Sequence, residues 1–425
     1  MKKIMVLVFV IVMIASVNQA EGQKKKKTKQ KSTSENTQPA ANTTTTPQAS
    51  ITANAKLVND DNLKEVEAKG VGLKHDDALQ DALRNAVGQA AGVAISSETS
   101  MENFVVVRDA VSSKTEGYIA SYTVINETPF SDRYEITVKA KVSLNPLKAD
   151  MQLLSKAIGG VRFLVMYDTR KVKPEEKAYY DYAVERINEY LAERKYRYIE
   201  KERFTALQKE SEGIYQNSAT NQETYIQNIG MKADAQFIIL ISNISISSRS
   251  EAFDTRTSSK VIVEAKAYDN CTAEGLGTVS LESDWKTGVD QKSTMLEGIK
   301  EASGAGLTKL LYLFNSYIGN WVNNGTPFEL RFYSIGTFRD FRDLRSKMLE
   351  DSHFGGQIEI VSFDNYTKLN LTYKDRPDEL AYKILDFADA IPEFKSKVLD
   401  VKLIYGRQIN FAPQKVTVPE LGTKK

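Results

Sequence analysis

The chain has 425 residues, a formal net charge of +2 and a single cysteine. This length predicts two to three domains, and one cysteine excludes a disulfide within the chain. The near-neutral charge argues against a nucleic-acid-binding protein, because such proteins usually carry a strong basic excess.

The amino terminus has the three parts of a secretory signal peptide. Two lysines precede an unbroken apolar run, Ile4–Ala15, and small residues then lead to a cleavage point after Gly22. The run is shorter than the roughly 18–20 residues that span a bilayer as a helix, which argues against the alternative of a retained anchor. We therefore expect residues 1–22 to be removed on export, with cleavage after Ala20 as the alternative. The mature protein is then expected in the periplasm or in association with the outer membrane.

Residues 23–57 form a leader rich in Lys, Thr and Asn, and such a composition cannot bury enough apolar surface to fold. We expect this leader to be disordered. Its basic end suits a weak contact with anionic lipid or polysaccharide through screened charge attraction, and a merely soluble tail is the alternative. The lysines of this basic end are Lys24, Lys25, Lys26, Lys27, Lys29 and Lys31.

The segment 58–150 predicts a small β-α-β-β domain. Acidic residues follow His75 at the start of a helix, whose apolar residues recur at helical spacing until Gly92. The stretch Ser96–Lys114 has no clear pattern. Alternation of apolar and polar residues predicts the three strands Val66–Gly70, Tyr118–Asn126 and Tyr134–Val142, the last two as a hairpin.

The segment 158–325 alternates strands and helices, which indicates a sheet covered by helices. Its opening run, Val161–Tyr167, is nearly all apolar, as in a strand buried on both faces. Leu296–Trp321 predicts one long helix, within which a Gly-Ala-Gly sequence indicates close helix packing. We interpret the polar stretch Ser247–Ser259 as a loop. The other predicted strands are Tyr196–Glu200, Phe237–Ile241, Val261–Tyr268 and Thr278–Trp285.

The segment 327–413 has the order β-α-β-β-α-β, which predicts the split βαβ arrangement of a ferredoxin-like domain. Residues 414–425 form a tail. The chain is therefore expected to have an α+β fold with an α/β middle domain, built as three small αβ domains in series. The strands predicted in the third domain are Phe328–Ile335, Ile358–Phe363, Leu369–Tyr373, Val401–Tyr405 and Ile409–Phe411.

Side chains suited to catalysis or metal binding are few. A zinc site needs about four nitrogen or sulfur ligands, whereas the chain has only two histidines, His75 and His353, and one cysteine, Cys271. No nucleophile elbow and no phosphate-binding loop is present in the sequence. We therefore predict no catalytic, cofactor-binding or metal-binding residues. Three aspartates near predicted strand ends are interpreted as solvated loop residues, namely Asp254, Asp269 and Asp284.

Four pieces of the first predicted domain occur in a familiar order. They are the strand Val66–Gly70, the helix Asp77–Val87, the sequence Gly117-Tyr118-Ile119 and the strand Tyr134–Val138. In this order the segment resembles the amino-terminal domain of the flagellar assembly protein T family of the periplasmic flagellar ring. The resemblance covers about a fifth of the chain and implies a role in an envelope assembly.

The second predicted domain carries a different resemblance. Its marks are the strand Val161–Tyr167, the turn Tyr198–Phe204 before Leu207–Glu210, and the sequence Ala233–Ile238. It is similar to the fold shared by the TolB amino-terminal domain, curli-type secretion channel lipoproteins and the lipoprotein activators of penicillin-binding proteins. The chain lacks the lipid-attachment cysteine and a recognisable channel hairpin. The resemblance therefore implies partner binding and supplies no catalytic residues.

We expect an exported, non-enzymatic scaffold or accessory subunit of a cell-envelope assembly, such as a flagellar ring, a secretion machine or a wall-synthesis machine. It would dock to envelope proteins or to copies of itself, because small αβ domains present sheet edges and helix faces to partners. A soluble periplasmic binding module for a glycan, lipid or small molecule is the alternative, and a hydrolase built on scattered carboxylates is a third reading. The binding module is suggested by tyrosines that crowd one region, namely Tyr179, Tyr180, Tyr182, Tyr190, Tyr196 and Tyr198.

Overall fold

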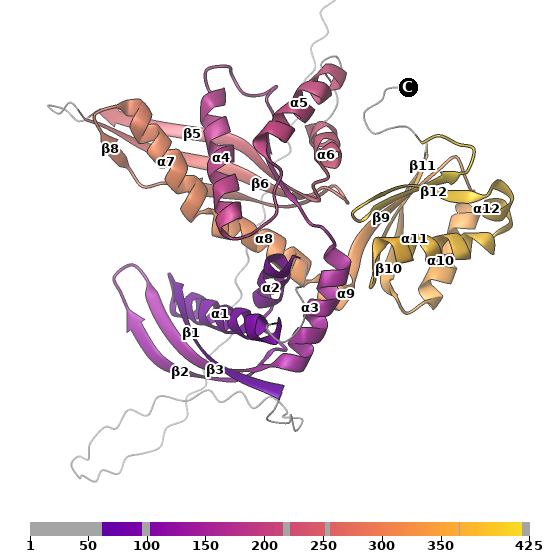
Figure 1. Ribbon diagram of the computed structural model, residues 1–425, viewed down its shortest axis with the longest axis horizontal. Helices are drawn as coiled ribbons and strands as arrows, with labels where there is room; N and C mark the ends of the chain where they lie inside the picture. The colour runs from indigo at the N-terminus through magenta and orange to yellow at the C-terminus, as the bar shows by residue number, and fades with distance from the viewer. Residues whose placement is uncertain (1–61, 96–102, 216–221, 251–255, 365, 419–425) are drawn as a thin grey trace, which may run out of the picture. The chain divides into compact units, whose positions relative to one another are not determined.

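The fold consists of helices packed on three separate sheets, which confirms the predicted α+β class (Figure 1). None of the helices among the described residues is long and apolar enough to cross a membrane. The predicted signal peptide and the lysine-rich leader lie outside the described residues. The computed structural model of the chain describes residues 62–95, 103–215, 222–250, 256–364 and 366–418.

The first sheet has the strand order β1-β3-β2, and all neighbouring strands are antiparallel. Helix α1 begins at His75 as predicted but continues past Gly92, because Ala94 is buried on the same side as the preceding alanines. Helix α2 lies within the stretch Ser96–Lys114 that showed no clear pattern. The elements are β1 (Leu63–Gly72), α1 (His75–Ile95), α2 (Phe104–Ser113), β2 (Ile119–Pro129), β3 (Tyr134–Ser143) and α3 (Leu144–Ile158).

Helix α1 lies unusually close to β1. A Cβ atom at Gly70 would meet the backbone nitrogen of Ala82 at 2.1 Å, and one at Gly72 would meet that of Ala78 at 2.4 Å. Glycine on the strand and alanine on the helix therefore allow the two backbones to approach. In this position α1 packs mainly on β1 and β3, and β2 stays exposed along nearly its whole length.

The second sheet has the order β4-β5-β6-β7, with β8 paired to β6, and only β4 and β5 are parallel. Helices cover both faces of the two parallel strands, as predicted: α4 and α8 lie on one face, and α5 and α6 on the other. Helix α7 packs beside α4, on β6. The elements are β4 (Phe163–Tyr167), α4 (Lys177–Glu193), α5 (Lys201–Tyr215), α6 (Gln222–Ala233), β5 (Phe237–Ser250), β6 (Thr257–Asp269), β7 (Glu274–Glu282), β8 (Lys286–Gly288), α7 (Gln291–Ala305), α8 (Leu307–Gly319) and α9 (Trp321–Asn324).

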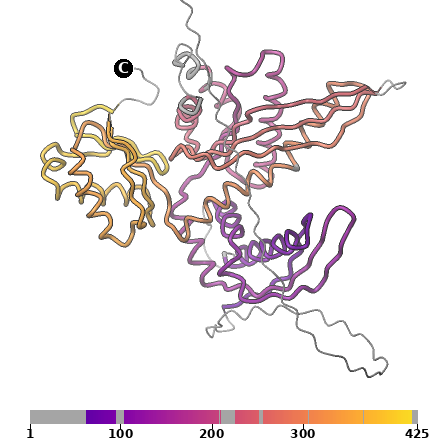
Figure 2. The backbone as a smooth tube through the Cα atoms, turned by 180° about the vertical axis from the view of Figure 1, so that it is seen from behind, coloured from indigo at the N-terminus to yellow at the C-terminus, as the bar shows by residue number. Residues whose placement is uncertain are grey.

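The polar stretch Ser247–Ser259 is not simply a loop, and that interpretation was wrong. Strands β5 and β6 continue into it as a long hairpin, with Ser248 paired to Ser259 (Figures 1 and 2). The hydroxyl group of the buried Ser259 bonds to that of Ser248 at 3.0 Å and to that of Thr294 on α7 at 2.9 Å. Polar side chains therefore satisfy one another inside this part of the sheet, where the apolar alternation of a strand is missing. Residues 251–255 lie outside the described residues.

Two other predictions for this region need correction. The single long helix predicted over Leu296–Trp321 is divided into α7, α8 and α9. The first break falls at Gly306, where a Cβ atom would lie 2.8 Å from a methyl group of Leu281 on β7, so the glycine does permit the close packing that was predicted. The predicted strand Tyr196–Glu200 is only a single bridge between Phe163 and Tyr198.

The third sheet has the order β10-β11-β9-β13-β12. β11 lies between β10 and β9, as the split βαβ arrangement predicts, and the fifth predicted strand, Ile409–Phe411, is present within β13. Gly406, with a φ of +52°, turns the chain back after β12 so that β13 inserts between β12 and β9 and runs parallel to β9. The elements are β9 (Thr326–Tyr333), α10 (Phe338–Glu350), β10 (Phe354–Phe363), β11 (Tyr366–Tyr373), α11 (Pro377–Asp389), α12 (Pro392–Lys397), β12 (Leu399–Tyr405) and β13 (Gln408–Pro413).

The buried apolar residues of the first and second sheets form one continuous cluster. The contact runs through α2 and α8, where a Cβ atom at Gly319 would lie 2.8 Å from the carbonyl oxygen of Ala110. The hydroxyl group of Ser113 on α2 also donates to the carbonyl oxygen of Asn315 on α8 at 3.3 Å. These contacts hold the helices of the first sheet against those of the second.

The second and third sheets are joined by a buried ion pair. The guanidinium group of Arg407 donates to both carboxylate oxygens of Asp269 at 2.6 and 2.5 Å, and the two residues are 4% and 0% exposed. Asp269 also accepts from the hydroxyl group of Tyr317 at 2.7 Å and from the backbone nitrogen of Cys271 at 3.0 Å. Arg407 lies over the ring of Trp321 at 4.5 Å. The prediction that Asp269 is a solvated loop residue was therefore wrong.

Arg407→Ala is expected to lower the free energy of unfolding by about 3–5 kcal/mol, because it leaves the buried carboxylate of Asp269 without its cation. Denaturant unfolding followed by the fluorescence of Trp321, in a Trp285→Phe background, measures the change. The exposed Arg342 provides a matched control, and Arg342→Ala is expected to change stability by at most about 0.5 kcal/mol.

The joint replacement of Asp269 by Leu and Arg407 by Met is expected to recover most of the loss, because apolar side chains of similar size can replace a buried ion pair. A stability of Arg407→Ala equal to that of the parent protein would contradict the assignment of this junction.

Candidate functional site

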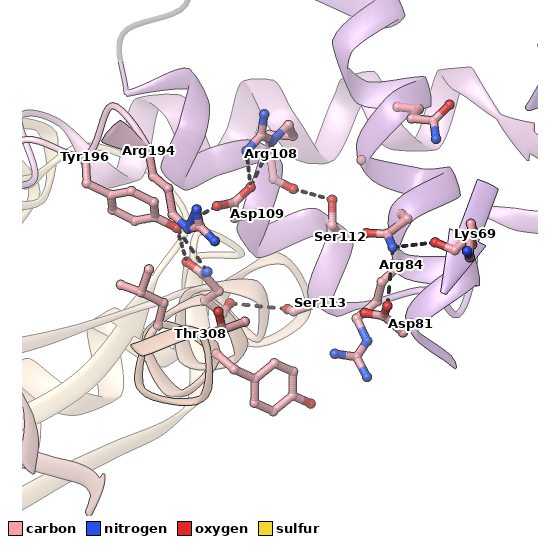
Figure 3. A pocket seen from close by; sticks show the side chains of 16 residues that line it. Lys69, Asp81, Arg84, Arg108, Asp109, Ser112, Ser113, Arg194, Tyr196 and Thr308 are labelled. Carbon is pink, nitrogen blue, oxygen red and sulfur yellow. Dashed lines mark hydrogen bonds and ion pairs between the residues drawn. The ribbon is translucent and has the colours of Figure 1, made fainter. Parts of the chain in front are cut away.

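A cleft of about 690 Å³ lies between the helices of the first sheet and those of the second (Figure 3). Helices α1 and α2 line one side, and α8 and the turn after α4 line the other. Its volume lies in the range of about 300–1,000 Å³ that is usual for ligand sites. The charged residues that line it are Lys69, Asp81, Arg84, Arg108, Asp109 and Arg194.

Both carboxylates of the cleft are engaged within the protein. Asp109 accepts from the guanidinium group of Arg108 at 2.8 and 2.6 Å and from the hydroxyl group of Tyr196 at 2.6 Å. Asp81 accepts from the backbone nitrogen of Val71 at 3.0 Å. Burial and, next, the Asp109 carboxylate raise the pKa of Tyr196 well above its ordinary value, so its hydroxyl group stays a donor at neutral pH. These carboxylates therefore serve the local structure.

The guanidinium groups of Arg84 and Arg194 are held by aromatic rings. The central carbon of Arg84 lies 5.3 Å from the ring centre of Tyr312, and that of Arg194 lies 4.0 Å from the ring centre of Tyr190. Among the described residues, neither group forms an ion pair with a carboxylate, whereas Lys69 is paired with Glu135. Arg84 and Arg194 therefore keep N–H donors available to a ligand.

The helices place these side chains by ordinary helical spacing. On α1, Arg84 and Asn85 follow Asp81 by three and four residues, and Gly88 follows them by four and three, so all four lie on one side of the helix. Arg108 lies on α2, in the stretch for which no element was predicted. The sequence shows the polar side of α1, but it does not show that α2, α8 and the turn after α4 pack around that side. For this reason the cleft was not predicted from the sequence.

The two histidines lie apart from the cleft and from each other. His75 is at the start of α1, with its ring 3.2 Å from Asp76 and 3.5 Å from Glu127, and about two fifths of its side chain is exposed. His353 precedes β10 and contacts Asp351 at 2.7 Å. In the described part of the chain, no three side chains of His, Cys, Asp or Glu cluster as a metal site would require.

The clustered tyrosines are mostly packing residues. Tyr196 lines the cleft, and Tyr190 lies beneath Arg194 at its edge. Tyr180 is buried, and its hydroxyl group accepts from the backbone nitrogen of Ile244 at 3.1 Å. The remaining members pack half-buried against the same core, namely Tyr179, Tyr182 and Tyr198. Of the six tyrosines, Tyr196 thus lines the cleft, and most of the others stabilise the core.

No protein-family model matches the chain, and a search of curated proteins found no significant match. The fold and the cleft are therefore the observations from which a function of this chain can be proposed. Of the described residues that line the cleft, most offer N–H donors or hydroxyl groups and none is a histidine or cysteine. This set of side chains is suited to holding an anion.

Tyr196→Phe is expected to lower the free energy of unfolding by about 1–3 kcal/mol, because Asp109 loses a donor in a half-buried place. Thermal or denaturant unfolding measures the loss. Tyr312 lines the same cleft but is 44% exposed, so Tyr312→Phe is the matched control and is expected to have an effect of at most about 0.5 kcal/mol. Equal effects of the two substitutions would contradict the assigned bond between Tyr196 and Asp109.

Cys271 is buried, and burial raises the pKa of its thiol to about 12. At pH 8 only about 10⁻⁴ of the thiol is then ionised, so the native protein is expected to resist iodoacetamide. Mass spectrometry after labelling measures this, and the same reaction in denaturant, which should modify Cys271 fully, is the control. Rapid labelling of the native protein would show that the thiol is accessible.

Proposed function

We propose that the chain is an exported, non-enzymatic scaffold or accessory subunit of a cell-envelope assembly, and that it acts by docking to other proteins. The observation that carries the proposal is the edge strand β2. It pairs with β3 on one side, and no strand of the described residues pairs with its other side. Such an edge presents free backbone donors and acceptors to another chain.

Apolar side chains accompany this free edge. Tyr122 and Val124 are 42% and 38% exposed, although they lie directly across from Ala140 and Val138 of β3, which α1 buries. Tyr122 and Val124 lie on the face of the sheet that α1 covers, but α1 does not extend over them. Ile125, at an irregularity in the strand, is 48% exposed. The edge and its apolar side chains thus form one continuous surface.

This surface suits an extended segment of a partner protein. In strand addition, backbone hydrogen bonds supply affinity and alternate side chains supply specificity. Soluble proteins usually protect long edge strands with charges or prolines. In β2 the only charged residue is Glu127 and the only proline is Pro129 at its end. β2 is paired regularly over Ser121–Val124 and over Asn126–Pro129, and the first stretch, which has no charge and no proline, is the part we expect the partner strand to meet.

Further support comes from rigidity and from resemblance. The buried pair of Asp269 and Arg407 fixes the third sheet to the second, as a protein that spaces its partners requires. The resemblance of 58–150 to the flagellar assembly protein T family, and of 158–325 to the TolB and curli channel group, favours an envelope machine as the site of docking. Export to the periplasm or to the outer membrane is part of the proposal and rests on the pattern of residues 1–22.

A soluble binding module for a glycan, lipid or small molecule is a second candidate. The specific observation in its favour is the cleft, which combines a ligand-sized volume with two guanidinium groups that have no carboxylate partner among the described residues. The two functions use different surfaces of the molecule, so one protein can have both.

A photo-crosslinking amino acid at position 124 tests the docking function in cells. We expect crosslinks to a defined set of motility, secretion or wall-synthesis proteins, identified by mass spectrometry. Val124→Arg is expected to reduce affinity capture of the same set at least about tenfold, because a charged side chain at the apolar edge opposes strand addition.

Tyr382 on α11 provides the matched control, because it is a large apolar side chain that is 66% exposed outside the first sheet. Tyr382→Arg is expected to leave capture unchanged. Capture that survives Val124→Arg, or equal crosslinking from positions 124 and 382, would overturn the assignment of β2 as the docking edge.

A further inference from the structure

The charges of the cleft do not balance within the protein. It is lined by four cationic and two anionic side chains, a difference of +2. Arg108 is neutralised by Asp109, and Lys69 is paired outside the cleft with Glu135. Asp81 accepts from backbone and amide donors. With Arg108 and Lys69 paired, Arg84, Arg194 and the Asp81 carboxylate remain, which is a net charge of +1. This positive charge belongs to Arg84 and Arg194, which have no carboxylate partner among the described residues.

We propose that this cleft binds a small organic dianion that carries hydroxyl groups, with Arg84 and Arg194 each holding one charged end. A guanidinium group presents N–H donors in a planar fork that matches a carboxylate or a phosphate. Each of these two groups already lies on a tyrosine ring, Tyr312 or Tyr190. Contact with a ring restricts the side chain but leaves the N–H groups in its plane accessible, which lowers the entropy lost on binding.

The two arginines approach the cleft from different sheets. Arg84 extends from α1 of the first sheet, whereas Arg194 follows α4 of the second (Figure 3). A ligand with one charged group would satisfy only one of them, whereas a ligand with a charge at each end satisfies both. This division of the positive charge is the reason for assigning a dianion.

The remaining walls suit the body of such a ligand. Gln89, Ser112 and Thr308 offer amide and hydroxyl groups, and Tyr312 offers a partly exposed ring. The hydroxyl group of Ser112 donates to the carbonyl oxygen of Arg108, and that of Thr308 is bonded to the hydroxyl group of Tyr190. Both oxygens can still accept from hydroxyl groups of a ligand, the amide of Gln89 can donate or accept, and the apolar face of the ligand can pack on the ring. A phosphorylated or carboxylated sugar has this combination of features. The inference does not depend on docking at β2.

Isothermal titration of the full chain at fixed ionic strength tests the site with three probes. Fructose 1,6-bisphosphate has two phosphates and hydroxyl groups, glucarate has two carboxylates and hydroxyl groups, and sorbitol has hydroxyl groups only. Each phosphate of the bisphosphate carries a charge of about −1.5 to −2 at neutral pH, so dianion here means a ligand with two anionic groups. We expect at least one of these two ligands to bind, sorbitol not to bind, and the affinity to fall as salt is raised. Tighter binding of the bisphosphate assigns phosphate as the ligand group, and tighter binding of glucarate assigns carboxylate.

Arg84→Gln and Arg194→Gln are each expected to weaken binding of that dianion about tenfold or more, because a hydrogen-bonded charge is lost at one end of the ligand. Arg342→Gln removes an exposed guanidinium group on the third sheet's helix α10 and is expected to leave affinity unchanged. The unfolding temperature of each variant without ligand verifies that it is folded.

The proposal is overturned if neither dianion binds the wild-type chain at millimolar concentration. It is also overturned if Arg84→Gln and Arg194→Gln bind as tightly as Arg342→Gln does, because the contact then lies elsewhere. Val124→Arg is expected to bind the dianion as the wild type does, so a failure of the docking proposal leaves this result unaffected.

Discussion

Asp269 is a fully buried carboxylate. A buried negative charge is strongly destabilising unless a cation and hydrogen-bond donors lie beside it. The partners of Asp269 come from different parts of the fold: Arg407 from the turn between β12 and β13, Tyr317 from α8, and the backbone of Cys271 just after β6. The carboxylate thus fixes three elements at one point. The glycine turn before Arg407 is part of the same constraint, because it directs the guanidinium group towards Asp269. The third sheet is therefore held by directional polar contacts in addition to apolar packing.

A second constraint operates in the first sheet. Gly70 and Gly72 let α1 approach β1 so closely that the helix packs over β1 and β3. The same approach takes the helix away from β2, and Tyr122 and Val124 are left exposed. The small residues that let α1 pack on one side of the sheet thus leave apolar side chains exposed on the edge strand at the other side. The core packing and the proposed docking surface have a common cause.

The sequence predicts secondary structure correctly where the residues of a single helix or strand are enough to produce the pattern. The apolar run Val161–Tyr167 identifies the buried strand β4. The acidic residues after His75 mark the start of α1, and the spacing of its apolar residues identifies it as a helix. Prediction failed where contacts between residues far apart in the sequence determine burial or secondary structure. Asp269 was placed in solvent because its partner, Arg407, lies 138 residues away. The polar ends of β5 and β6 were interpreted as a loop because their hydroxyl groups are satisfied by one another and by α7. The cleft likewise needs the contact between α2 and α8, which residue spacing does not indicate.

Helix α8 contributes side chains both to the cleft and to the buried junction around Asp269. Its 13 residues span about 20 Å at the usual rise of an α-helix. Tyr312 and Asn315 line the cleft, and Tyr317, less than two turns further on, contacts the buried Asp269. One helix therefore contributes side chains both to the cleft and to the junction of the second and third sheets, so a displacement of α8 would move both sets of side chains together.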